Sequence, residues 1–132
     1  MIARVCAAAL AGAALWSQAA LAQSSGAALF AQNCAACHQP AGQGVPGAFP
    51  ALAGDSFVQG DPAAVAAVLL HGRGGMPNFS DDLSDTEIAA ILSHVRSSWG
   101  NHAAPIPPAT VAAVRGEGKA PVDAASPVLP YH

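Results

Sequence analysis

The sequence has very little charge of either sign. Only 10% of its 132 residues are charged, with five basic and eight acidic side chains, and Lys119 is the only lysine. A chain this poor in basic residues lacks the positive surface that binds nucleic acid or anionic lipid, so neither is an expected partner. The length suits one small domain. Protein partners must therefore be recognised mainly through apolar and shape contacts.

Long apolar runs are absent except at the N-terminus. Residues 1–22 carry one early charge, Arg4, followed by an apolar stretch that ends in small residues. This pattern is typical of a secretory signal, and we predict a signal peptide at 1–22. An uncleaved membrane anchor is the alternative, but Gly12, Ser17 and Gln18 interrupt the run, which is shorter than the roughly 20 apolar residues of a spanning helix. We therefore expect export to the periplasm and no membrane span after cleavage.

Cysteine is scarce, and its placement is informative. Cys6 lies in the predicted signal, so the expected mature chain retains only Cys34 and Cys37, directly followed by His38. Cys-x-x-Cys-His is the haem c attachment pattern, because two thiols on one turn reach two vinyl groups while the imidazole projects at the iron. A zinc site would need a second cysteine pair, and a thioredoxin-type pair would need a βαβ context that is not indicated here. A structural disulfide is the third alternative to one covalent haem c.

Methionine is also rare, and this bears on the second axial ligand of such a haem. Beyond the predicted signal the only thioether is Met76, which follows two glycines and precedes Pro77. Because glycine and proline favour a loop over a helix face, we predict that Met76 binds the iron opposite His38. An ordinary packed methionine is one alternative. Histidine ligation is the other, and the candidates are His71, His94, His102 and His132.

Apolar spacing and capping residues predict helices and no sheet. We expect a helix over 26–33 capped by Ser24 or Ser25, and a second that starts at Asp61-Pro62 and stops near Gly72. The clearest helix begins with a capping box of Ser84 and Glu87, and its apolar face comprises Ile88, Ile91, Leu92, Val95 and Trp99. The glycine- and proline-rich segment 39–55 between the first two helices is expected to be a loop. The predicted fold class is all-α.

These features together resemble class I cytochrome c over about residues 26–101. The shared features are a helix leading into Cys34-Ala35-Ala36-Cys37-His38, a proline loop, a methionine loop and a final amphipathic helix. Two segments, 68–72 and 95–101, are most similar to haem domains of cytochrome subunits of bacterial membrane-bound dehydrogenases. Those subunits commonly carry several haems, whereas this chain has one attachment motif.

The resemblance extends to two finer positions. Gly26 and Phe30 fit a Gly-x-x-x-aromatic pattern in which the small residue lets the first and last helices cross closely. Pro50 fits the family proline whose carbonyl accepts a hydrogen bond from the proximal imidazole and so orients it.

The resemblance implies three to four helices wrapped around one covalent haem. The implied cofactor-binding residues are Cys34, Cys37, His38, Pro50 and Met76, with His38 and Met76 as the iron ligands. We predict a signal peptide at 1–22, a cytochrome domain at 23–102 and a Pro-rich tail at 103–132. That tail is expected to be solvated and partly wrapped on the domain, with partner docking as the alternative and a short helix between 110 and 115.

The function implied is that of a mono-haem electron carrier rather than an enzyme. Single electrons would pass by outer-sphere transfer between redox partners such as a dehydrogenase or a terminal oxidase. Ala35, Val45 and Phe49 are expected to frame the exposed haem edge, and Arg73 is a candidate partner for a haem propionate. The alternatives are a haem enzyme or gas sensor with an open iron site, and a purely structural haem subunit.

Overall fold

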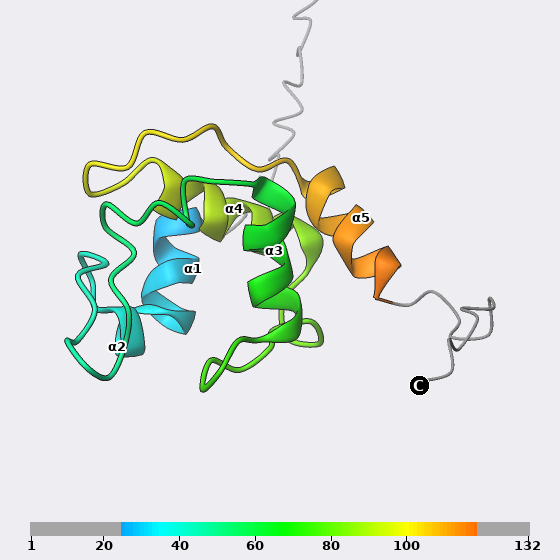
Figure 1. Cartoon of the computed structure of the whole chain (residues 1–132). Helices are drawn as coiled ribbons and strands as arrows, with labels where there is room; N and C mark the ends of the chain where they lie inside the picture. Colours follow the sequence, from blue (N-terminus) through cyan, green and yellow to red (C-terminus); the bar gives the residue numbers. More distant parts are fainter. Residues whose placement is uncertain (1–24, 119–132) are drawn as a thin grey trace, which may run out of the picture.

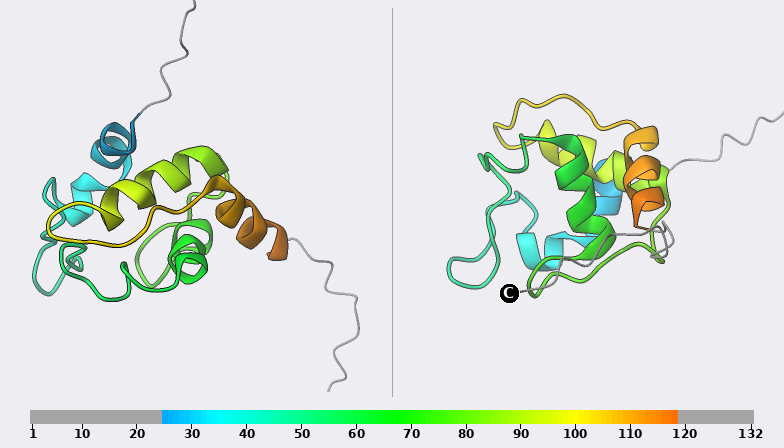
Figure 2. Two further views of the ribbon diagram at one scale, coloured as in Figure 1. Left: turned by 90° about the horizontal axis from the view of Figure 1, so that it is seen from above. Right: turned by 45° about the vertical axis from the view of Figure 1, so that its right-hand side comes forward.

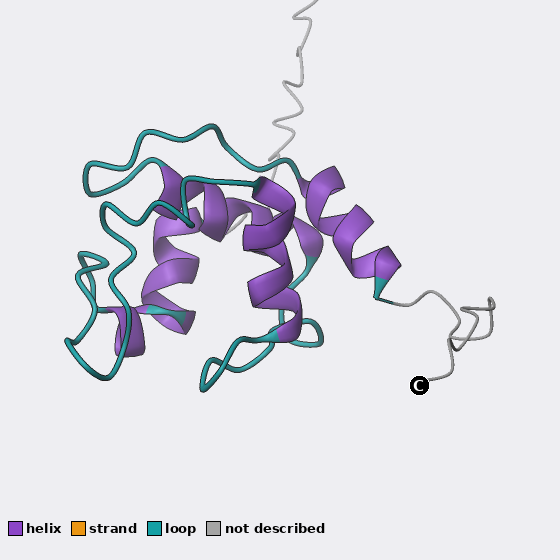
Figure 3. Ribbon diagram, in the orientation of Figure 1, coloured by secondary structure: helices purple, strands orange, loops and turns teal. Residues whose placement is uncertain are grey.

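The computed structural model describes residues 25–118 and contains five helices over that range (Figure 1). They are α1 (Gly26–Asn33), α2 (Ala35–His38), α3 (Pro62–His71), α4 (Asp85–Arg96) and α5 (Pro108–Glu117). No strand occurs between residues 25 and 118, where loops connect the helices (Figure 3). The all-α prediction is confirmed, although the helix count is five rather than three to four. The predicted signal peptide lies outside the described residues.

Side-chain caps define where three of the helices begin. Ser25 accepts a hydrogen bond from the Ala28 amide at 3.2 Å at the start of α1, and Asp61 caps α3 just before its first-turn proline. At α4 the capping box is complete, because the Ser84 hydroxyl accepts from the Glu87 amide and the Glu87 carboxylate accepts from the Ser84 amide. Such caps satisfy amides that the first helical turn leaves without partners. The three helix starts predicted from the sequence are confirmed.

Helices α1 and α4 cross with almost no space between them. An added Cβ at Gly26 would lie only 2.1 Å from the Ala90 carbonyl oxygen of α4. Further along the crossing, the Phe30 ring of α1 packs against Trp99, with ring centroids 5.0 Å apart, and against His94 at 5.8 Å. Trp99 is therefore a packing residue, as expected, but it lies three residues beyond the end of α4 and not on the face of that helix. A small residue at position 26 is what permits this close approach.

One hydrophobic core joins the helices. Its centre is the inner face of α4, where Ile88 and Ile91 are almost fully buried. Around them pack the other buried side chains of α4 and those of α1, α3, α5 and the connecting segments, namely Leu29, Phe30, Val58, Val65, Ala66, Leu69, Leu70, Leu83, Ala89, Leu92, Val95, Ile106, Val111 and Val114. The aliphatic residues predicted on the apolar face of this helix are all in this core.

The proline-rich segment after residue 102 contributes to the core, which the predicted boundary did not anticipate. Ile106, Val111 and Val114 are buried, and α5 packs against α3 and α4 on the side away from α1 (Figures 1 and 2). The helix expected between 110 and 115 is longer, because Pro108 occupies its first turn, where a missing amide hydrogen costs nothing. The folded unit thus extends to at least Glu117. Residues 119–132 of the predicted tail lie outside the described residues.

Two buried polar side chains at or just after the C-terminal end of α4 form hydrogen bonds to neighbouring loops. The Arg96 guanidinium donates to the carbonyls of Val58 at 2.7 Å, Gly60 at 3.0 Å and Ala104 at 2.8 Å. Asn101, which is 1% exposed, accepts from the Gly54 amide and donates to the carbonyls of Leu52 and Val95. Because a buried polar group is costly unless it is hydrogen-bonded, these satisfied contacts hold the loops in one arrangement.

Candidate haem c site

The Cys-x-x-Cys-His motif forms the junction between α1 and α2. Cys34 ends α1, with its amide donating to the Phe30 carbonyl at 2.8 Å, and the His38 amide donates back to the Cys34 carbonyl at 2.9 Å. This single helical turn places Cys34, Cys37 and His38 together. Both cysteines are free thiols, and Cys37 is exposed while Cys34 is half-buried. A structural disulfide between them is thus not formed.

The surroundings of Cys34 make its thiol less acidic than usual. Burial, together with the proximity of Cys37, raises the pKa of the Cys34 thiol to about 11. Cys34 is therefore neutral at physiological pH and packs as a small apolar group against the core that includes Phe30.

The His38 imidazole is buried and held in a defined orientation. Its Nδ1 lies 2.9 Å from the carbonyl oxygen of Pro50, and the ring is 8% exposed. Because a carbonyl can only accept, Nδ1 carries the proton and Nε2 keeps its lone pair. This is the tautomer that a metal-ligating histidine requires. Pro50 is thus the residue that orients the ring, through the contact that the family resemblance implies.

The loop that carries Pro50 is fixed close to the motif. The Gly44 amide donates to the His38 carbonyl at 2.9 Å, and the Gly42 carbonyl accepts from the amides of Leu52 and Ala53. Gly42 has φ +63°, and an added Cβ there would lie 2.4 Å from the Trp99 ring. Glycine is therefore required at position 42 both for its backbone conformation and for the close packing of Trp99.

Met76 lies in a tight turn after α3. The amide of Arg73 donates to the Met76 carbonyl at 3.2 Å, and the Met76 amide donates to the Arg73 carbonyl at 3.0 Å. Gly72 has φ +76°, and an added Cβ there would lie 2.6 Å from the Met76 carbonyl oxygen. The Met76 side chain is half-buried against the core. The predicted loop around the only thioether beyond the expected signal is present.

The structure brings four of the five predicted site residues together directly. Cys34, Cys37, His38 and Pro50 form one cluster, whereas no hydrogen bond links Met76 to any of them. Met76 and Cys34 do contact the same core. Figure 1 shows α2 and the turn that follows α3 at the same end of the molecule.

The alternative histidine ligands have other surroundings. His71 is exposed at the end of α3, next to Gly118, and His102 is also exposed. His94 packs edge-on against Trp99 at a centroid distance of 5.5 Å and lies 3.3 Å from the Ser98 hydroxyl. His132 lies outside the described residues. Between residues 25 and 118 no group of three or more His, Cys, Asp or Glu side chains could hold a metal ion.

Apolar side chains are exposed on the loops near the motif. Val45, Phe49 and Phe57 are 37%, 43% and 40% exposed, and they are the large hydrophobic side chains exposed between residues 25 and 118. The Arg73 guanidinium lies over the Phe57 ring, 4.9 Å from its centroid.

Sequence reasoning missed the polar residues that fasten the loops. Arg96 follows Leu92 by four positions and so falls on the buried stripe of α4, which was a detectable signal. The sequence predicts Gly100-Asn101 as the stop of the last helix and gives Asn101 no other role, whereas α4 already ends at Arg96. Arg115 was assigned no role, yet it forms an ion pair with Asp85. Each of the three residues has a partner 30 or more residues away in the sequence.

A small all-helical domain with this motif defines the class of c-type cytochromes. Residues 21–95 match the family described as cytochrome C oxidase, cbb3-type, subunit III, which is more than half of the chain. The chain therefore belongs to this family of cytochrome c domains. Its cofactor is covalent haem c, and the family is one of electron-carrier domains.

Similar proteins are cytochromes or cytochrome subunits. The chain is 43% identical over 98 residues to cytochrome c-552 of Thermus thermophilus, which covers 62% of this chain and 65% of that one. It is 38% identical over 101 residues to the cytochrome c subunit of the quinone alcohol dehydrogenase of Gluconobacter oxydans. This match covers 67% of this chain and 20% of that subunit. The cytochrome subunit of the fructose dehydrogenase of Gluconobacter japonicus is 36% identical over 109 residues, which cover 71% of this chain and 22% of that subunit. The chain thus spans about two thirds of the first relative and about a fifth of the dehydrogenase subunits.

The residues present fit haem c. Two free thiols lie on one turn, and the imidazole that follows them has its Nδ1 occupied and its Nε2 available. One attachment motif matches one haem.

Within residues 25–118 no helix is long and apolar enough to cross a membrane.

Proposed function

We propose that this protein is an exported, periplasmic mono-haem cytochrome whose iron is bound by His38 and Met76, and that it carries single electrons between redox proteins. The observation that carries the proposal is the hydrogen bond from His38 Nδ1 to Pro50, which leaves Nε2 free beside two thiols. In this proposal residues 1–22 are the export signal. The folded domain begins after them and includes α5.

Each site residue has a distinct task. Cys34 and Cys37 attach the porphyrin, His38 supplies the proximal nitrogen, and the Pro50 carbonyl holds the ring and increases its basicity as a ligand. Met76 supplies the opposite thioether. A bound haem provides an iron that cycles between ferrous and ferric forms. Thioether ligation and burial both raise its potential relative to ligation by two histidines.

The proposed partners are redox proteins such as a dehydrogenase or a terminal oxidase. The relatives include cytochrome subunits of alcohol and fructose dehydrogenases, and the family description names an oxidase subunit. Val45 and Phe49 are exposed on the loop that carries Pro50, so they are suited to frame an apolar electron port. Of the three arginines in residues 25–118, Arg96 is buried and Arg115 is in an ion pair. Apolar contacts must therefore dominate docking, and association should depend only weakly on salt.

Mass spectrometry and optical spectroscopy together test the proposal. Made with a working periplasmic maturation system, the chain should gain the mass of one haem, and the ferric protein should show the near-infrared sulfur-to-iron charge-transfer band. The variants Cys34→Ala and Cys37→Ala should each fail to form the normal two-thioether product. A parent protein without added haem mass would refute haem attachment. A parent with attached haem and no such band would refute Met76 as a ligand while leaving attachment intact.

A further inference from the structure

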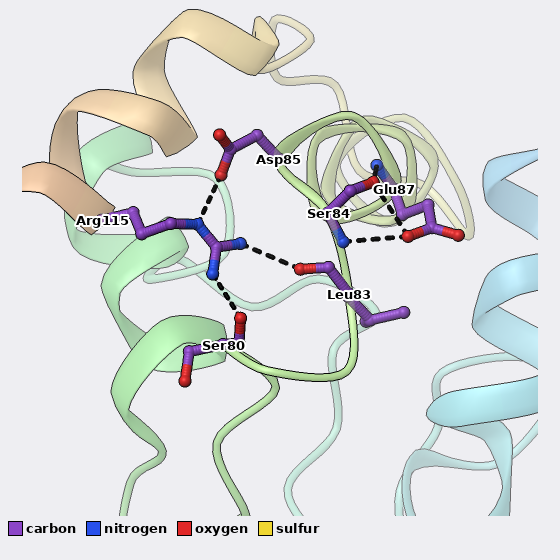
Figure 4. Close-up of polar contacts among 6 residues, drawn as sticks. All are labelled: Ser80, Leu83, Ser84, Asp85, Glu87 and Arg115. Atoms are coloured by element: carbon purple, nitrogen blue, oxygen red, sulfur yellow. Dashed lines mark hydrogen bonds and ion pairs between the residues drawn. The ribbon is translucent and has the colours of Figure 1, made fainter.

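Arg115 of α5 makes three contacts with one short segment of the chain. Its Nε lies 2.7 Å from Asp85 Oδ1, its Nη2 donates to the Leu83 carbonyl at 2.9 Å, and its Nη1 donates to the Ser80 carbonyl (Figure 4). Ser80 and Leu83 belong to the connection between the methionine turn and α4, and Asp85 is the first residue of α4. One side chain of α5 thus binds two backbone carbonyls of this connection.

This connection has few other hydrogen bonds to the rest of the domain, although Leu83 is buried in the core. Its backbone is tied to α3 where the Phe79 amide donates to the Leu69 carbonyl at 2.7 Å, and it turns through the bond from the Leu83 amide to the Phe79 carbonyl. In the described part of the chain, neither Ser80 nor Leu83 has a carbonyl that accepts a backbone amide. Arg115 is therefore the protein partner of both carbonyls, and Ser80 is only four residues after Met76.

Arginine is suited to this position in a way that lysine is not. The guanidinium is planar, stays charged at all accessible pH values and presents several donors in a fixed fork. Here it spans a carboxylate and two carbonyls while only 21% exposed. Val111 and Val114 of α5 are buried in the core, so the helix carrying Arg115 is itself held in place.

We propose that Arg115 is a positioning residue for Met76. By fixing the Ser80 and Leu83 carbonyls, it holds the C-terminal side of the methionine turn and keeps the thioether from leaving the iron. The proposal rests on the proposed function, in which Met76 is an iron ligand. It also gives α5 a role in the haem site in addition to its contribution to the core.

The test compares four holoproteins: the parent, Arg115→Ala, Arg115→Lys and Val111→Ala. Val111→Ala is the matched control, because it weakens the packing of α5 without removing a donor from the connection. In each ferric protein we would measure imidazole binding, which requires Met76 to detach, and the intensity of the charge-transfer band. Hydrogen exchange over residues 77–83 reports the connection itself, and thermal unfolding reports overall stability.

Arg115→Ala should bind imidazole roughly tenfold more tightly than the parent, as expected from the loss of hydrogen bonds to a charged group. Backbone hydrogen exchange over residues 77–83 should be faster than in the parent. Arg115→Lys should show both changes to a smaller extent than Arg115→Ala. Val111→Ala should lower thermal stability with little change in imidazole affinity. If Arg115→Ala and Val111→Ala lower stability and raise imidazole affinity equally, the positioning role is wrong. A parent without the charge-transfer band would instead refute Met76 ligation, which is a separate failure.

Discussion

At the scale of single residues, His38 and Met76 are held in different ways. His38 is buried, and its ring is oriented by a side-chain bond to the Pro50 carbonyl. Met76 is half-buried in a turn closed by two backbone bonds to Arg73. In the proposed site, a thioether on a surface turn would be the weaker of the two iron ligands. The choice between a carrier and an open haem site therefore depends on Met76.

Replacing Met76 with alanine should open the iron site. The variant removes the only thioether between residues 25 and 118, so the ferric iron should become five-coordinate, bind water or capture a histidine such as His71. We expect a lower potential, loss of the charge-transfer band and much readier binding of carbon monoxide to the ferrous form. Potentiometry and carbon monoxide titration of the holoprotein measure these changes. An unchanged potential with unchanged resistance to carbon monoxide would show that another group is the ligand.

At the scale of helices, the crossing of α1 and α4 leaves no space for a side chain at Gly26. Gly26→Ala would place a Cβ 2.1 Å from the Ala90 carbonyl oxygen. Overpacking of this kind lowers the free energy of unfolding by about 1–3 kcal/mol. Gly116→Ala is the matched control, because that helical glycine has nothing within 4 Å of an added Cβ. The control should stabilise by roughly 0.5 kcal/mol, since alanine favours helix over glycine.

Thermal unfolding of the two glycine variants should give shifts of opposite sign. A Gly26→Ala protein as stable as the parent would mean that α1 and α4 can separate without cost.

The capping box of α4 should make stability depend on pH in a defined direction. Hydrogen bonds from the Ser84 amide and hydroxyl hold the pKa of Glu87 below its usual value. The ionised carboxylate therefore stabilises the folded protein above the ordinary glutamate pKa, and this contribution is lost as the pH falls through the lowered pKa. Ser84→Ala should remove the part of it that the hydroxyl supplies, together with a helix cap worth about 1 kcal/mol, while the bond from the backbone amide remains.

Melting temperatures of the parent and Ser84→Ala, recorded from neutral to acidic pH, measure this effect. The difference between them should be greatest at neutral pH and should shrink in acid. Glu87→Gln is the control, because it removes the titrating group and should flatten the dependence. A difference that stays constant with pH would exclude the carboxylate as its source.

At the scale of the whole molecule, α5 belongs to the same core as the helices that surround the haem motif. A chain ending at residue 105 loses Ile106, Val111 and Val114 from that core, whereas a chain ending at Gly118 keeps all three. Full burial of such a side chain contributes about 1.5–3 kcal/mol, so the shorter chain should lose roughly 5 kcal/mol. Denaturant unfolding of both holoproteins measures the loss. Equal midpoints for the two chains would show that α5 is dispensable for stability.

Local features were predictable from the sequence. The three capped helix starts and the turn around Met76 depend on contacts between residues a few positions apart, such as the three-residue reach from Ser84 to Glu87. The haem c motif is equally local, because its three residues occupy one helical turn. Its single copy, together with the spacing of apolar residues, was enough to predict an all-α cytochrome with one haem.

Only the tertiary structure decided which hydrogen bonds hold the loops and α5 in place. The bonds from Arg96 to Val58, from Asn101 to Gly54 and from Arg115 to Leu83 join groups 38, 47 and 32 residues apart. No periodicity relates such positions, because each pairing forms only when the whole chain has folded around α4. For the same reason the proline-rich segment was interpreted as a tail. Its buried residues have no partners nearby in sequence, and their burial depends on the surface that α3 and α4 present.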